Sequence, residues 1–219
     1  MVMTTELDQM IAAYRARKDE LDRQGAYFLS DITDEEAERF SKSLLIMASQ
    51  LKGRGPNPAI TVYVNSGGGS VGAGFAMMEM IYKIRRDFGV RVNTVVTGYA
   101  YSMGAIVFQA GDRRLMGHFS TLMLHSVNWV VSGEDTRIFK DFQKLANHYQ
   151  MLIGELFAQR SGKHTARWWR NYIYSGHDQF LSSQECLKLG LADEVCSFDQ
   201  CYLVSSAPAQ PSGTPAPRP

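Results

Sequence analysis

The sequence predicts an α/β fold in which helices cover a parallel sheet. Two apolar β runs, residues 60–64 and 90–97, are each followed by a sharp turn and a helical stretch. The first turn is glycine-rich and leads into a helix over residues 71–88; the second begins at Gly98 and leads into a short apolar helix from Ala105. Strand, turn and helix repeating in this order are typical of βαβ units, whose strands run parallel.

Length and composition describe an ordinary globular protein. The chain has 219 residues, of which 45% are hydrophobic, which suits one folded domain with short appendages. Lys and Arg number 23 against 22 Asp and Glu, and a net charge of +1 argues against a protein built to grip nucleic acid or an anionic membrane. No stretch approaches the roughly 18 consecutive apolar residues of a membrane span. The N-terminus lacks the basic-then-apolar order of a signal peptide, so we expect a soluble, cytoplasmic protein.

The three cysteines do not suggest a disulfide framework or a metal site. Cys186, Cys196 and Cys201 are odd in number, and the spacing of the last two does not suit a zinc knuckle. We therefore expect reduced structural thiols, no metal and no cofactor in the chain itself.

The chain divides into three parts. Residues 1–25 predict a charged amphipathic helix, because apolar residues recur at helical spacing between residues 5 and 23. Residues 26–203 form the expected folded domain, whose first helix has Thr33 as N-cap and Glu36 three residues later. Residues 204–219 are almost all Ser, Ala, Pro and Gly and predict a disordered tail.

The longest helical signal covers residues 132–160. Ser132 and Asp135 form a capping-box pattern at its start, and Gly162 marks its end. Apolar residues follow one seam at spacings of three and four: Ile138, Phe142, Leu145, Tyr149, Leu152 and Leu156. Such a helix is about 40 Å long at 1.5 Å per residue. It suits either a surface helix packed on the core or a helix that projects into an oligomer interface.

Ser102 is the sharpest candidate for chemistry. It lies between a strand and a helix, with Ala100 two residues before it and Gly104 two residues after it. Small residues at both positions are what a nucleophile elbow requires, because its tight turn excludes larger side chains. A serine that only caps the following helix has a similar local sequence, so this alternative stays open.

The glycine-rich turn at residues 67–69 has more than one interpretation. It suits a phosphate cradle, a backbone N–H that approaches a reacting carbonyl, or a plain turn with positive φ. No Walker lysine follows, and the acidic residue expected of a dinucleotide site is missing because Thr97 and Gly98 occupy its place. Nucleotide binding is therefore disfavoured.

A histidine and an aspartate complete a candidate triad. His125 directly follows an apolar strand, whereas the other four histidines lie among polar residues. Asp178 lies in a turn before a helix that starts near Ser182, where its carboxylate is free to orient an imidazole, although a plain turn aspartate fits as well. In a triad the histidine deprotonates the serine, and the aspartate holds the histidine in the required tautomer.

Four segments in order resemble the ClpP family, the proteolytic subunits of the Clp protease, within the crotonase-like superfamily. Residues 64–69 read VNSGGG against the family's I-N-S-P-G-G, and residues 98–105 read GYAYSMGA against G-Q-A-A-S-M-G-A. Residues 123–125 read MLH against M-I-H, and residues 178–182 read DQFLS against D-R-F-[LM]-S. Four such segments in one order are far more specific than any one of them.

The resemblance implies a fold, a site and partners. The fold would consist of repeated ββα units with a projecting handle helix at about residues 132–160. The implied site comprises Ser102 as nucleophile, His125 as general base, Asp178 as its orienter, and the N–H groups of Gly69 and Met103 as the oxyanion hole. The implied activity is hydrolysis of unfolded polypeptides within two stacked heptameric rings, fed by an AAA+ unfoldase that uses ATP.

Related folds also carry other functions. A catalytically silent or specialised structural subunit of a mixed ring would not need the triad. A Ser/Lys enzyme would need a lysine beside Ser102 and usually a membrane anchor, and an acyl-CoA enzyme shares only the fold.

The chain departs from the family pattern in several places, but no catalytic group is lost. The substituted positions are Gly67, Ser126, Val127 and Tyr101, where the family has alanine, and about four residues are added around 85–91.

Overall fold

A seven-stranded sheet organises the molecule. The computed structural model describes residues 2–55, 57–127 and 136–196. Five parallel strands follow the order β1-β2-β3-β4-β7, with bounds Ala26–Leu29, Ala59–Ser66, Arg91–Tyr101, Arg114–Gly117 and Glu194–Cys196. The last residues of β3 also pair in parallel with β5 (Thr121–Leu124), and β5 pairs antiparallel with β6 (Gln179–Ser182). The predicted α/β class with a parallel sheet is confirmed.

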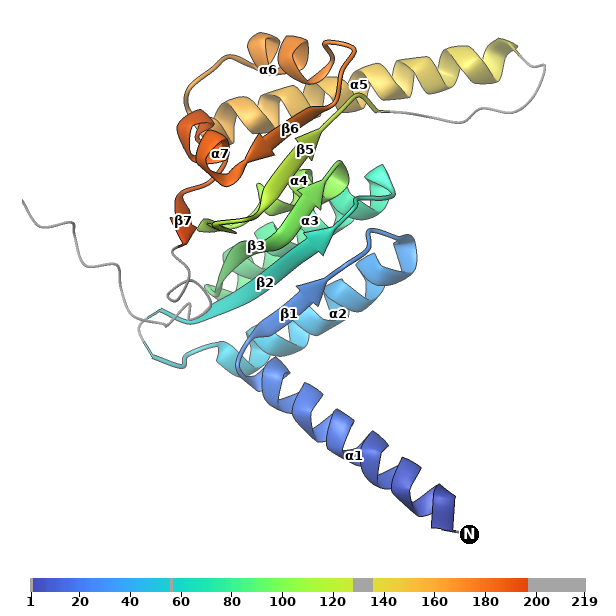
Figure 1. Cartoon of the computed structure of the whole chain (residues 1–219), viewed down its shortest axis with the longest axis vertical. Coiled ribbons are helices and arrows are strands. Elements are labelled where there is room, and N and C mark those ends of the chain that lie inside the picture. The colour runs from blue at the N-terminus through green and yellow to red at the C-terminus, as the bar shows by residue number, and fades with distance from the viewer. Residues whose placement is uncertain (1, 56, 128–135, 197–219) are drawn as a thin grey trace, which may run out of the picture.

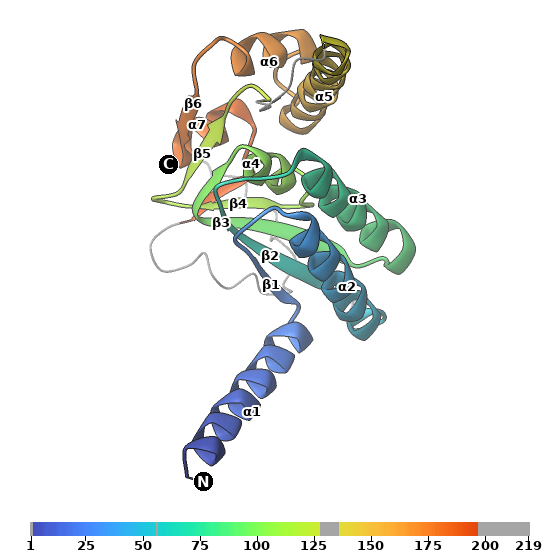
Figure 2. The ribbon, with the colours of Figure 1, turned by 90° about the vertical axis from the view of Figure 1, so that its right-hand side faces the viewer.

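Two amphipathic helices cover one face of β1, β2 and β3. They are α2 (Asp34–Leu51) and α3 (Val71–Phe88), and Figure 2 shows both on the same side of the sheet. The Thr33 hydroxyl accepts a hydrogen bond from the Glu36 N–H, and the Ser70 hydroxyl accepts one from the Ala73 N–H. These N-caps satisfy donors that a helix leaves unpaired, and the predicted Thr33 cap is confirmed.

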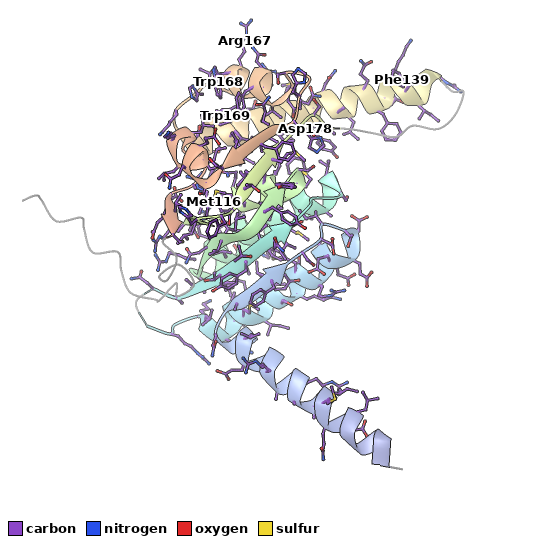
Figure 3. All side chains as sticks on the ribbon, viewed as in Figure 1. Met116, Phe139, Arg167, Trp168, Trp169 and Asp178 are labelled. Atoms are coloured by element: carbon purple, nitrogen blue, oxygen red, sulfur yellow. The ribbon has the colours of Figure 1, made fainter. Side chains whose placement is uncertain are left out.

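A second helical layer covers the β5–β6 end of the sheet. It contains α5 (Thr136–Ser161), α6 (Ala166–Ile173) and α7 (Ser183–Leu189). The C-terminal half of α5 belongs to the core, because Ile153 and Phe157 are buried there. The N-terminal half extends beyond the sheet, where Phe139 is 59% exposed (Figures 1 and 3). The predicted capping box at Ser132 and Asp135 lies outside the described residues, as does the predicted tail.

Several elements differ from the sequence-based expectation. The second predicted strand does not stop at Gly98, because β3 continues to Tyr101 and ends directly at Ser102. The next helix, α4 (Met103–Phe108), begins two residues earlier than predicted. The short elements β1, α6, β6 and β7 were not predicted, since segments of three to eight residues carry little periodicity. Cys196 is disulfide-bonded, so the expectation of a reduced thiol is wrong there, whereas Cys186 is a free, buried thiol.

The N-terminal helix α1 (Val2–Arg23) leads away from the sheet (Figures 1 and 2). It exposes Leu7 and Met10, which are 57% and 69% accessible. Among the described helices, none combines the length and apolarity that crossing a membrane demands.

A buried arginine joins β4 to the segment before β7. Arg114 is 4% exposed, and its guanidinium donates to Asp193 at 2.6 and 3.1 Å and to the Gln109 side chain at 2.6 Å. Gln109 in turn donates to the Leu191 carbonyl. Burial alone would raise the pKa of Asp193, but the hydrogen bonds and charge of Arg114 outweigh it, so the pKa is lowered. This network anchors the last strand of the sheet.

Candidate active site

The strand-to-helix turn holds Ser102 in a strained backbone conformation. Its φ of 53° and ψ of −123° make it the one non-glycine with positive φ among the residues that the structure describes. Such a conformation costs about 1–3 kcal/mol and persists only where its surroundings enforce it. The Ser102 side chain does not cap α4. The structure therefore favours a nucleophile elbow over a simple N-cap.

Close packing explains the small residues around this elbow. A Cβ on Gly104 would lie 3.0 Å from the Ser66 carbonyl oxygen, and Ala100 is completely buried. A Cβ on Gly68 would lie 2.7 Å from the Ser102 Cβ. The glycine-rich loop after β2 and the elbow after β3 are therefore packed directly against each other, and glycine is required at this contact.

His125 lies within hydrogen-bonding distance of Ser102. The His125 Nε2 is 2.7 Å from the Ser102 Oγ. β5 positions the imidazole: Tyr101 and Met123 pair in the parallel register, and the Ser102 N–H donates to the Met123 carbonyl. The strand pairing thus places residue 125 beside the elbow, although 23 residues separate it from Ser102 in sequence.

Two backbone N–H groups adjoin this serine. Met103 is the first residue of α4, so its N–H is one of those that a helix leaves without an internal partner. Gly69 forms an isolated parallel β-bridge with Ile32. The hydrogen bonds of this bridge join the Ile32 N–H to the Gly68 carbonyl and the Ser70 N–H to the Ile32 carbonyl, so the Gly69 N–H takes no part in it. Gly69 has a φ of 147°, and a Cβ at this position would lie 2.1 Å from the Ile32 carbonyl oxygen. A larger residue therefore cannot replace it.

A pocket of about 160 Å³ connects these groups. Ser102, His125 and Ser126 line it with polar side chains, and Gly69 and Met103 of the glycine-rich loop and the elbow line it as well. Apolar side chains line the rest: Val71, Ile106, Leu124, Val127, Ile153, Phe157 and Ile173. The contribution of α5 and α6 to this pocket was not predicted from the sequence. The spacing of Ile153 and Phe157 was visible as an apolar helix face, but α6 itself was not predicted.

Asp178 directly precedes β6, at the end of the ladder where His125 directly follows β5. Leu124 pairs with Gln179, so one further step of this antiparallel register brings residue 125 opposite residue 178. The Asp178 side chain is exposed (Figure 3), and within the described part of the chain no hydrogen bond joins its carboxylate to the His125 imidazole. The structure thus brings Ser102 and His125 into contact and places the third predicted member at the same end of the β5–β6 ladder.

The family model described as Clp protease matches residues 12–199. The chain belongs to the Clp protease family. This match covers the whole sheet, the Ser102 elbow and α5, so the resemblance seen in the four short segments extends over nearly all of the folded chain.

Two curated relatives of the Clp protease family show moderate similarity. One, from Chlorella vulgaris, is 27% identical over 175 residues, which are 79% of this chain and 82% of the relative. The other, from Oltmannsiellopsis viridis, is 28% identical over 178 residues, 80% of this chain and 85% of the relative. Both are named ATP-dependent Clp protease proteolytic subunit.

Proposed function

We propose that this protein is a serine endopeptidase of the ClpP type, with Ser102 as nucleophile and His125 as general base. The observation that carries the proposal is the 2.7 Å contact between His125 Nε2 and Ser102 Oγ at a strained elbow. Hydrogen-bond contact between nucleophile and base is the geometric requirement for this chemistry. Membership of the Clp protease family supports it.

The reaction begins when the Ser102 Oγ attacks the peptide carbonyl carbon and passes its proton to His125 Nε2. The carbonyl oxygen becomes an oxyanion, which the N–H groups of Gly69 and Met103 stabilise from the same pocket. His125 then donates its proton to the leaving amine. Water hydrolyses the resulting ester by the same steps, which restores the Ser102 hydroxyl.

Asp178 orients His125 in this proposal. For Nε2 to accept the serine proton, the neutral imidazole must carry its proton on Nδ1, and a carboxylate beside Nδ1 favours that tautomer. The β5–β6 register supports Asp178 in this role, because it brings residue 178 opposite residue 125.

The substrate is an unfolded polypeptide that places an apolar side chain in the pocket. The lining by Leu124, Ile153, Phe157 and Ile173 supports an apolar residue at the position whose carbonyl is attacked. A backbone must approach Ser102 in extended form to reach the two N–H donors together. Folded proteins do not present such segments, so an unfolding partner is required for them.

Assembly into two stacked heptameric rings, served by an AAA+ ATPase, completes the proposal. The relatives' name, ATP-dependent Clp protease proteolytic subunit, supports the partnership with an ATPase. The projecting half of α5 exposes Ile138 and Phe139, at 46% and 59%, and Leu152 in its C-terminal half is 38% exposed. Large apolar side chains in such positions support contact with a second copy of the chain.

Labelling with a fluorophosphonate probe, followed by peptide mapping, tests the proposal. We expect one modified serine, Ser102, and no labelling or peptide hydrolysis in Ser102→Ala. The matched control is Ser49→Ala, which removes an exposed serine of α2 and should label like the wild type. Labelling that persists in Ser102→Ala, or maps to another serine, contradicts the assignment.

A further inference from the structure

Three aromatic side chains form a surface cluster close to the site, and we call Tyr99, Tyr101 and Phe180 the aromatic patch. The ring centroids of Tyr99 and Tyr101 are 4.8 Å apart, and those of Tyr101 and Phe180 are 5.7 Å apart at an interplanar angle of 90°. Tyr99 is 39% exposed and Phe180 is 61% exposed. Exposed aromatic residues that gather in one cluster usually mark a binding surface.

The strand register puts the aromatic patch next to the catalytic histidine. Tyr101 pairs with Met123, and Met123 pairs with Phe180, so the three form one row across β3, β5 and β6. Side chains two residues apart on a strand share a face. His125 lies two residues after Met123, directly after β5, and Asp178 lies two residues before Phe180, directly before β6. At about 3.4 Å per residue of extended chain, both lie about 7 Å along the strands from this row.

The apolar pocket lies toward the opposite face of the same strands. Leu122 and Leu181, which alternate with the members of the row, are buried in the core together with the pocket residues Leu124, Phe157 and Ile173. His125 therefore lies between two apolar surfaces, the pocket on the helix side and the aromatic patch on the outer side.

The aromatic patch is ordered before any ligand arrives. The Tyr101 hydroxyl lies 3.0 Å from the Thr121 Oγ1 on the neighbouring strand, and the edge-to-face contact with Phe180 holds both rings. Rings that are already held lose little conformational freedom when they bind a ligand, which lowers the cost of binding.

The chemistry of the reaction decides which part of a substrate meets this surface. The residue whose carbonyl is attacked lies at Ser102 and the two N–H donors, and its side chain enters the pocket. His125 must protonate the leaving amine, so the leaving segment lies on the side of His125 and β5. Successive side chains of an extended chain point to opposite sides, so the next residue faces away from the pocket and toward the outer face.

We propose that the aromatic patch is a subsite for an apolar or aromatic side chain on the leaving-group side of the scissile bond. This inference rests on the proposed peptidase function and adds a second specificity determinant to it. The occupant is the extended substrate, because the patch continues the face that carries His125.

The test uses two internally quenched peptides that differ only in the residue after the cleaved bond, Phe in one and Ser in the other. The measurement is the ratio of their kcat/KM values, and mass spectrometry verifies the cleaved bond. We expect the wild type to prefer the Phe peptide, and Phe180→Ala and Tyr101→Ala to reduce this ratio about 2- to 10-fold, the range expected for one aromatic contact. Tyr101→Phe, which keeps the ring, should retain the preference.

Phe28→Ala is the matched control, because Phe28 is a 63% exposed aromatic residue that stacks on Tyr63 at the opposite end of the sheet. Its ratio should equal that of the wild type. Unchanged ratios in Phe180→Ala and Tyr101→Ala overturn the subsite. A change of sedimentation coefficient in these variants, with unchanged ratios, shows instead that the patch contacts a second copy. Fluorophosphonate labelling of Ser102 separates the two proposals, since its absence in the wild type refutes the peptidase itself.

Discussion

Leu124 and Gln179 are the last residues to pair in the antiparallel ladder of β5 and β6. His125 follows Leu124 and Asp178 precedes Gln179, so a strand pairing, rather than proximity in sequence, brings the proposed base and its proposed orienter to the same edge. The ladder connects the proposed catalytic histidine to a carboxylate that lies 53 residues later in the chain.

Asp178→Asn should lower kcat strongly without loss of folding. An amide in place of the carboxylate favours the wrong imidazole tautomer, and in a comparable triad this change costs about 10⁴-fold. The measurement is kcat on a quenched peptide, with sedimentation as a check on assembly. Asp8→Asn, an exposed aspartate on α1, is the control. Near-wild-type turnover in Asp178→Asn would exclude Asp178 from the mechanism.

Leu145→Glu combined with Leu152→Glu should split the assembled particle into single rings or smaller species. Both residues lie on the apolar seam of α5, and Leu152 is 38% exposed in the single chain. Charges without partners in an interface cost about 3–5 kcal/mol each. Sedimentation velocity and peptide hydrolysis on the same samples measure the effect, and we expect both to fall.

Gln143→Glu with Asn147→Glu is the matched control, because it adds the same charge to the same helix at exposed polar positions. It should remain assembled. If the leucine variant also stays assembled, or the wild type is a monomer, α5 does not form the interface.

Asp193→Asn should destabilise the fold at neutral pH. The buried Arg114 loses its charged acceptor, and a hydrogen bond to a charged group contributes about 1.5–3 kcal/mol. We expect a loss near the lower end of that range, because the Asp193 side chain is 40% exposed. Urea unfolding at pH 7 measures the change, and an unchanged midpoint would show that the pair contributes nothing.

The Asp193 carboxylate also makes the free energy of unfolding depend on pH. The pKa of Asp193 is lower in the folded protein, so its contribution is present above the unfolded pKa of about 3.9 and is lost as the pH falls through the folded value. Asp193→Asn should therefore lose less stability than the wild type between pH 5 and pH 2. Parallel acid-unfolding curves for the two proteins would contradict this.

Cys186 should be inert in the folded protein. Burial, with a smaller contribution from the Glu185 charge, raises the pKa of its thiol to about 12, and the thiolate is the reactive form. Iodoacetamide at pH 8 should leave Cys186 unmodified in the native state and modify it in urea, as mass spectrometry can follow. Rapid native labelling would mean that α7 opens readily.

The elements that the sequence predicted well are those with a strong local signal. The β2–α3 unit, the Thr33 cap and the α5 periodicity depend on residues within one or two helical turns of each other. The predicted end of β3 was wrong, because a glycine at position 98 is typical of the end of a strand. In the structure the Asn65 side chain accepts a hydrogen bond from the Tyr99 N–H, which supports the extended backbone of β3 beyond Gly98.

Local order and spacing in the sequence are enough to predict the fold class, the family resemblance, and the serine and histidine at the centre of the site. Whether Ser102 bonds to His125 or caps its helix, and which apolar residues line the pocket, depends on the tertiary packing. A buried core face and a pocket wall have the same helical spacing, as Ile153 and Phe157 show. Only the packing of α5 and α6 against β5 separates the two, because a pocket is space that distant segments leave unfilled.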